Sequence, residues 1–116
     1  IKGLIINRFQ GDTQETGNGI FLGGLGGNQI IGNFIGTDAT GTIGFNTQRW
    51  GILVDSNNNQ IGGAAPAERN VISGNSGNGI YLRGFLGLTQ GNLVRGNYIG
   101  TDLTGTQALG NFNGIQ

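Results

Sequence analysis

The sequence contains no cysteine, no histidine, no methionine and only one proline. Without cysteine or histidine it has no disulfide, no thiol nucleophile, no imidazole base and none of the usual zinc ligands. Six basic residues balance six acidic ones, so the formal net charge is zero. A neutral chain lacks the basic excess that binds nucleic acid or an anionic membrane surface. We therefore expect no nucleic-acid partner, no metal and no cofactor.

Long apolar runs and helix-forming residues are scarce as well. No apolar run approaches the ~20 residues of a membrane span, so we expect no membrane insertion. Five Ala, two Glu and one Lys offer little from which to build helices. Ile, Leu, Val and Phe make up 33 of the 116 residues, enough for a folded core. Because the 26 glycines and many asparagines interrupt these apolar residues every few positions, the sequence predicts short strands joined by tight turns.

The chain contains long internal repeats. Residues 32–42, GNFIGTDATGT, recur as residues 96–106, GNYIGTDLTGT, with nine of eleven positions identical. Residues 17–22, GNGIFL, recur as residues 77–82, GNGIYL. The first offset is 64 residues and the second is 60, which places a short insertion near residues 84–90. Repeats of this length indicate that similar structural units stack on one another.

A shorter period lies inside the long one. A Gly-Ile pair ends at Ile20, Ile52, Ile80 and Ile115, with spacings of 32, 28 and 35 residues. A unit of about 30 residues without a helix buries its apolar side chains only against a neighbouring unit. If each unit is one coil, equivalent strands pair in parallel about 4.8 Å apart. The sequence therefore predicts an all-β fold, a parallel β-helix of about four coils without a long helix, as a single domain over residues 1–116.

The predicted coils place equivalent side chains in ladders. Three ladders of inward residues are expected: Ile20, Ile52, Ile80 and Ile115; Ile30, Ile61 and Val94; Ile35 and Ile99. Asparagines at the turns are expected to form hydrogen-bonded ladders of their own.

Four motifs together resemble a known repeat family. GNxIGTDxTGT, RNVISGN (69–75), NQIGG (59–63) and GNGI(F/Y)L look like the right-handed parallel β-helix repeats of large secreted and surface proteins of bacteria. The resemblance implies right-handed winding, an extracellular or cell-surface location, and adhesins among the similar proteins. It extends more distantly to the scaffold of pectate lyases and polygalacturonases, although fold alone does not carry function over that distance.

Three charged residues are candidates for chemistry. Asp38 and Asp102 occupy equivalent positions in the two GTD motifs. Two rungs apart, they would lie roughly 9–10 Å from each other, near the upper end of the range for inverting glycosidases. Asp after Thr also caps turns, and repetition favours that interpretation because a turn is needed in every unit. Arg83 is a candidate cation for a lyase, but the sequence shows no acidic cluster to accompany it.

A row of outward side chains is the candidate ligand-binding surface. With Ile20, Ile52 and Ile80 inward, strand alternation points Phe21, Leu53 and Tyr81 outward. Trp50 stands where other units have asparagine, so these four residues form what we call the outer aromatic strip. Such a strip would stack on sugar rings or contact a protein. The alternative, which the apolar insertion Gly84–Gln90 favours, is a strip that packs under a covering loop.

These features lead to two functional expectations. The first is a non-enzymatic extracellular structural or adhesive module, with a polysaccharide or cell-surface partner or with end-to-end association of copies. The chain would then be an excerpt of a longer solenoid, or a unit that polymerises through exposed strand edges. The alternative is a fragment of a polysaccharide lyase or glycoside hydrolase of the pectin-degrading type.

Overall fold

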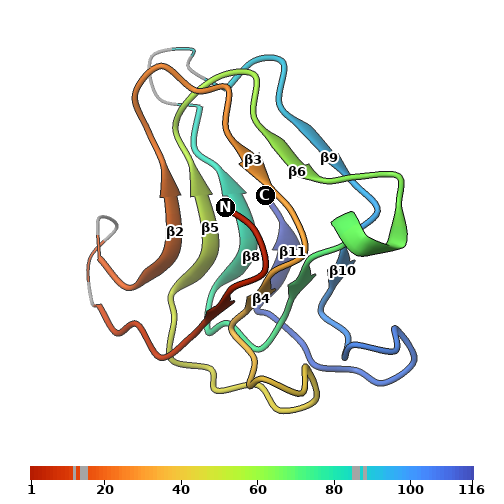
Figure 1. Ribbon diagram of the computed structural model, residues 1–116. Coiled ribbons are helices and arrows are strands. Elements are labelled where there is room, and N and C mark those ends of the chain that lie inside the picture. The colour runs from red at the N-terminus through yellow and green to blue at the C-terminus, as the bar shows by residue number, and fades with distance from the viewer. Residues whose placement is uncertain (12, 14–15, 85–86, 88) are drawn as a thin grey trace.

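The computed structural model describes residues 1–11, 13, 16–84, 87 and 89–116, whose strands form three parallel sheets (Figure 1). The first sheet contains β1 (Ile5–Ile6), β4 (Phe34–Ile35), β7 (Val71–Ile72) and β10 (Tyr98–Ile99). The second contains β2 (Asn18–Leu22), β5 (Trp50–Val54), β8 (Asn78–Leu82) and β11 (Asn113–Ile115). The third contains β3 (Gln29–Ile30), β6 (Gln60–Gly62) and β9 (Leu93–Arg95). Each strand pairs with its equivalent one coil away, so the predicted parallel β-solenoid is confirmed.

The solenoid makes about three turns, whereas the sequence predicted about four coils. The difference arises at the two outer rungs. The first rung contributes only β1 to a sheet, and the last rung contributes only β11. Three rungs are complete, with one strand in each sheet. In the described part of the chain, the helix is a single 3₁₀ turn, η1 (Pro66–Glu68), in the loop between β6 and β7.

The core consists of the predicted aliphatic ladders. Ile20, Ile52 and Ile80 are in register across β2, β5 and β8, and Ile115 continues the ladder in β11. The second ladder is also confirmed, with Ile61 between Ile30 and Val94. In the third, Ile72 lies between Ile35 and Ile99. Ile52, Ile61 and Ile72 lie on β5, β6 and β7, which have a neighbouring coil on both sides. These three side chains are therefore completely buried.

Amide side chains form ladders at the turns, as expected. Asn33, Asn70 and Asn97 make one ladder, in which each Nδ2 donates to the Oδ1 of the next asparagine at 3.0 and 2.8 Å. Asn28, Asn59 and Asn92 make a second, and Gln48, Asn75 and Asn111 make a third. In both asparagine ladders the backbone N–H donates to the same oxygen as the side chain. In these three ladders, each side chain donates toward the next coil in the C-terminal direction.

Candidate functional site

The two GTD loops use their aspartates to close their own turns. Asp38 Oδ1 accepts hydrogen bonds from the N–H groups of Thr42 and Ile43, both at 3.1 Å. Its Oδ2 accepts from the Thr40 hydroxyl at 2.7 Å. The Thr40 hydroxyl, followed by the backbone N–H groups, stabilises the charged form and lowers the pKa of Asp38 to about 2. A carboxylate held in this way is a poor general acid at neutral pH.

Asp102 has the same role in its own loop. Its Oδ1 accepts from the Thr104 hydroxyl at 2.7 Å and from the N–H groups of Thr106 and Gln107 at 3.2 and 3.3 Å. The pKa of Asp102 is lowered, mainly by the Thr104 hydroxyl and further by the backbone N–H groups. Each candidate carboxylate therefore caps the turn of its own loop.

The same loops also cover the aromatic residue of their motif. A Cβ added at Gly41 would lie 3.5 Å from the Phe34 ring, and one at Gly105 would lie 2.8 Å from the Tyr98 ring. Both loops thus fold back over the ring that precedes them. The Leu103 N–H donates to the Gly41 carbonyl oxygen at 2.8 Å, so the two loops contact each other although a coil without such a loop lies between them.

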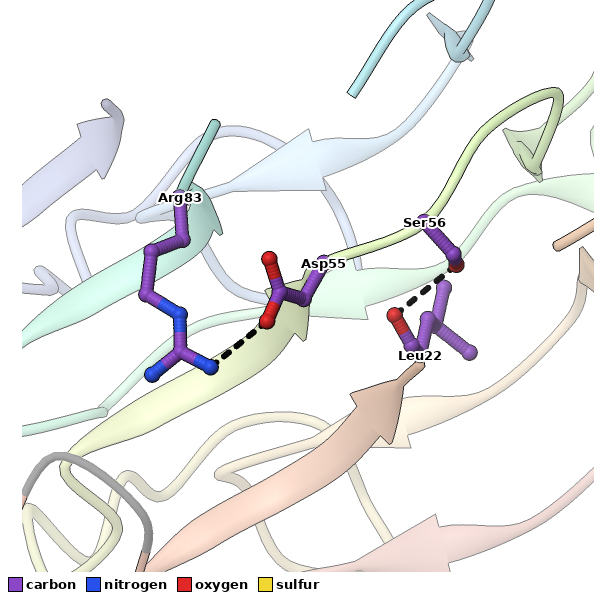
Figure 2. A network of polar contacts seen from close by, with 4 residues as sticks. All are labelled: Leu22, Asp55, Ser56 and Arg83. Atoms are coloured by element: carbon purple, nitrogen blue, oxygen red, sulfur yellow. Dashed lines mark hydrogen bonds and ion pairs between the residues drawn. The ribbon is translucent and has the colours of Figure 1, made fainter. Parts of the chain in front are cut away.

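Arg83, the candidate cation, forms an ion pair with Asp55 (Figure 2). The Arg83 Nη2 atom lies 2.6 Å from Asp55 Oδ2, and the two side chains are only 16% and 13% exposed. Beside this pair, the Ser56 hydroxyl donates to the Leu22 carbonyl oxygen at 2.9 Å (Figure 2). Asp55 follows β5 as Arg83 follows β8, so the pair joins two adjacent coils. The 28-residue spacing between them, close to one coil, was the sequence signal that could have revealed this pair.

The outer aromatic strip is not a continuous exposed surface. Phe21 is 54% exposed and Tyr81 is half-buried, but Leu53 is completely buried and Trp50 is 6% exposed. Leu53 is in register with Phe21 on one side and Tyr81 on the other, and these larger side chains flank it. Leu53 therefore presents no exposed surface, whereas the predicted strip placed it on the outer face. Residues 85, 86 and 88 of the insertion expected to cover the strip lie outside the described residues.

A lateral groove of about 440 Å³ lies at the starts of β5, β8 and β11. Its aromatic residues are Trp50, Tyr81 and Phe112, and its amide residues are Asn78, Asn113 and Gln116. The Trp50 and Tyr81 ring centroids are 4.8 Å apart with the planes tilted by 51°. Phe112 is 80% exposed. Of its nine lining residues, the groove therefore contains two of the predicted strip, Trp50 and Tyr81, and seven that sequence reasoning missed.

The amides of the lateral groove are joined in a chain of hydrogen bonds. Asn113 Nδ2 donates to Asn78 Oδ1 at 2.9 Å, and Asn78 Nδ2 donates to Gln116 Oε1 at 2.7 Å. Asn78 and Asn113 occupy equivalent positions on adjacent strands, which brings their side chains within hydrogen-bond distance. The chain fixes the orientation of three amide groups beside three aromatic rings.

Three further observations concern metal ions, membranes and similar proteins. In the part of the chain that the structure describes, no three acidic, histidine or cysteine side chains gather where they could hold a metal ion. Within the same residues, no helix has the length and hydropathy needed to cross a membrane. Comparison of the chain with protein-family models, with curated proteins and with solved structures finds no significant match.

Proposed function

We propose that this chain is a non-enzymatic structural segment of an extracellular or cell-surface β-solenoid protein, related to the right-handed bacterial repeats that its motifs resemble. The observation that carries the proposal is that the polar and aromatic side chains of the repeated motif contact other parts of the same motif. Asp38 and Asp102 cap their turns, and Phe34 and Tyr98 pack under their loops. A motif whose polar and aromatic groups are engaged in folding supports a scaffold function.

The lateral groove supports an adhesive role on this scaffold. It combines exposed aromatic surface with fixed amides, a combination suited to ligands that have both apolar faces and hydroxyl groups. The partner we propose is a polysaccharide, free or at a cell surface.

End-to-end association of copies is a second proposal, supported by the two outer rungs. Ile5 in β1 is 51% exposed and Ile115 in β11 is 49% exposed, whereas Ile52 and Ile80 inside the stack are completely buried. Within residues 1–116, both outer strands also present an edge to which another strand can pair. Sedimentation velocity tests this directly: association should increase with concentration and be abolished by Ile115→Lys. A wild-type chain that stays monomeric near millimolar concentration would contradict it.

The alternative, a fragment of a pectin-degrading enzyme, has less support. A lyase of that type needs a cation base beside a cluster of acidic groups that bind calcium, and no three acidic side chains gather in this way anywhere in the described part of the chain. A glycosidase needs one carboxylic acid that is protonated near neutral pH. The pKa values of Asp38 and Asp102 are instead both lowered.

Release of new reducing ends from polygalacturonate and from neutral polysaccharides tests the proposal. We expect no release by the wild-type chain above that of the buffer. The Asp38→Asn/Asp102→Asn double variant and Arg83→Ala serve as controls for contaminating activity, because a contaminant would persist in them. Release by the wild type that is abolished in a folded variant would overturn the structural proposal in favour of the enzyme.

A further inference from the structure

We propose that the lateral groove binds an oligosaccharide, with sugar rings against Tyr81 and Phe112, buried Trp50 as the support of Tyr81, and sugar hydroxyls on the amides of Asn113 and Gln116. This inference rests on the proposed adhesive function and names its site and its ligand class. The proposed site excludes Phe21 and Leu53, the two residues of the outer aromatic strip that do not line the groove.

The aromatic rings of the groove are held before a ligand arrives. Trp50 contacts Tyr81, and the Arg49 guanidinium lies 4.9 Å from the centroid of the Trp50 ring. Fixed rings bind with little further loss of side-chain entropy, which is why rigid aromatic residues dominate many binding surfaces. The C–H groups on the face of a pyranose carry slight positive charge and are attracted to the negative face of such a ring.

Phe112 supplies exposed apolar surface at the rim of the groove. It is 80% exposed, compared with 54% for Phe21 and 53% for Phe9. It lies beside Asn113, the first residue of β11, and contributes to the groove from the same coil as Gln116. An exposed ring next to a groove of fixed rings is suited to stack on a ligand that spans several coils.

The amide chain supplies hydrogen bonds of defined direction. Because Asn113 donates to Asn78 and Asn78 donates to Gln116, the chain leaves an acceptor at Asn113 Oδ1 and a donor at Gln116 Nε2. A sugar hydroxyl both donates and accepts, so it can satisfy either end. Amides whose geometry is already set give more selectivity than mobile ones.

Among the described residues, those that line the groove include no aspartate and no glutamate. Glycoside hydrolysis requires two carboxyl groups flanking the bond that breaks. A glycan held here is therefore bound and not cleaved, in agreement with a non-enzymatic module. The volume of about 440 Å³ lies within the range of ligand sites, and its open form suits a chain that extends beyond the groove.

Isothermal titration with cellohexaose, mannohexaose and hexagalacturonate tests the inference. The wild type should bind at least one of them with a Kd between about 1 μM and 1 mM. Phe112→Ala should weaken that binding at least ~10-fold, and Gln116→Ala by ~3- to 10-fold. Both residues are exposed, so neither change should unfold the chain. Phe21→Ala is the matched control, an exposed phenylalanine on the same sheet outside the groove, and it should change Kd less than ~2-fold.

Each outcome separates this inference from the proposed function. Absence of binding by all three hexasaccharides, with no release of reducing ends, would overturn the groove inference and leave the structural proposal standing. Equal weakening by Phe21→Ala and Phe112→Ala would overturn the groove as the site. Binding at the groove accompanied by new reducing ends would retain the site and overturn the non-enzymatic function.

Discussion

Asparagine side chains bind neighbouring coils to one another through several hydrogen bonds each. Asn70 is completely buried, and its Nδ2 donates to the Ile30 carbonyl oxygen and to Asn97 Oδ1. Its Oδ1 accepts from the backbone N–H and the side chain of Asn33. A buried amide with every group paired stabilises one alignment of the coils, because any shift leaves polar groups unpaired.

Replacing Asn70 with alanine should therefore be costly. Asn70→Ala removes the partner of the buried Asn33 N–H and of the Ile30 carbonyl oxygen, and we expect the free energy of unfolding to fall by about 2–4 kcal/mol. Asn28→Ala is the matched control, because Asn28 is an exposed member at the end of another ladder. It should cost less than about 1 kcal/mol. Urea titration measures both, and equal losses would contradict a stabilising role for the interior of the ladder.

The aspartates of the GTD loops predict how stability depends on pH. The pKa of Asp38 falls from 3.8 to about 2 on folding, and that of Asp102 is lowered as well. A carboxyl whose pKa is lower in the folded state stabilises the fold above its unfolded pKa, and that contribution is lost as pH falls through the folded pKa. We expect the thermal midpoint of the wild type to fall between about pH 5 and pH 2.

The Asp38→Asn/Asp102→Asn double variant is the control for this effect. It should be less stable than the wild type at pH 7 and should lose less stability in acid, so that the two thermal midpoints converge toward pH 2. Parallel curves for the two proteins over this range would show that neither carboxylate is responsible.

Two elements are aligned by the ion pair at the ends of β5 and β8. Arg83 and Asp55 are both mostly buried, and Asp55 Oδ1 has no hydrogen-bond partner among the described residues. Removing the cation would leave a poorly solvated carboxylate, which usually costs more than the pair itself contributes. We expect Arg83→Ala to lower the free energy of unfolding by about 1–3 kcal/mol.

Arg95 in β9 provides the matched control, since it is an arginine on an exposed strand position of the next sheet. Arg95→Ala should change stability by less than about 0.5 kcal/mol. Guanidinium denaturation would obscure an ion pair through its ionic strength, so urea is the suitable denaturant. Equal effects of the two changes would exclude a specific function for the pair.

Gly62, the last residue of β6, must be glycine for two separate reasons: its backbone conformation and its close contact with the next coil. Gly62 has a φ of +80°, and a Cβ there would overlap the Arg95 carbonyl oxygen and Asn97 Oδ1 in the next coil. Gly24 has a φ of +75° with nothing within 4 Å of an added Cβ. Gly24→Ala should therefore cost about 1–2 kcal/mol for the backbone alone, and Gly62→Ala more than about 3 kcal/mol. Thermal unfolding of both variants measures the difference, and similar costs would contradict the close approach of coils.

The strands and their register could be predicted from sequence, whereas the outer surface could not. The Gly-Ile spacing identified the Ile20, Ile52 and Ile80 ladder because an inward residue has the same surroundings in every coil. The burial of Leu53 could not be predicted in this way, since it depends on the sizes of its particular neighbours. The lateral groove combines the starts of β5, β8 and β11 with Phe112, the residue just before β11. Asn113 and its equivalent Asn78 are 35 residues apart, so no single motif contains that combination.

The whole molecule is a short stack in which most contacts join adjacent coils. Stability in such a fold is close to a sum of coil and interface contributions, so an interior coil is held on two faces and an outer one on a single face. The repeated residues supply that interface: aliphatic ladders inside, amide ladders at the turns, and capped GTD loops outside. The repeated motifs therefore specify contact between coils, while the ligand site that we propose lies on the side of the stack.

Native-state hydrogen exchange followed by NMR tests that claim most directly. The backbone amides of β5, β6 and β7, each with a coil on both sides, should exchange most slowly, with protection close to that of global unfolding. Amides of β1 and β11 should exchange faster, by at least ~10-fold, because each has a coil on one side only. Uniform protection across all rungs, or slower exchange in β1 and β11 than in β5, would contradict the account.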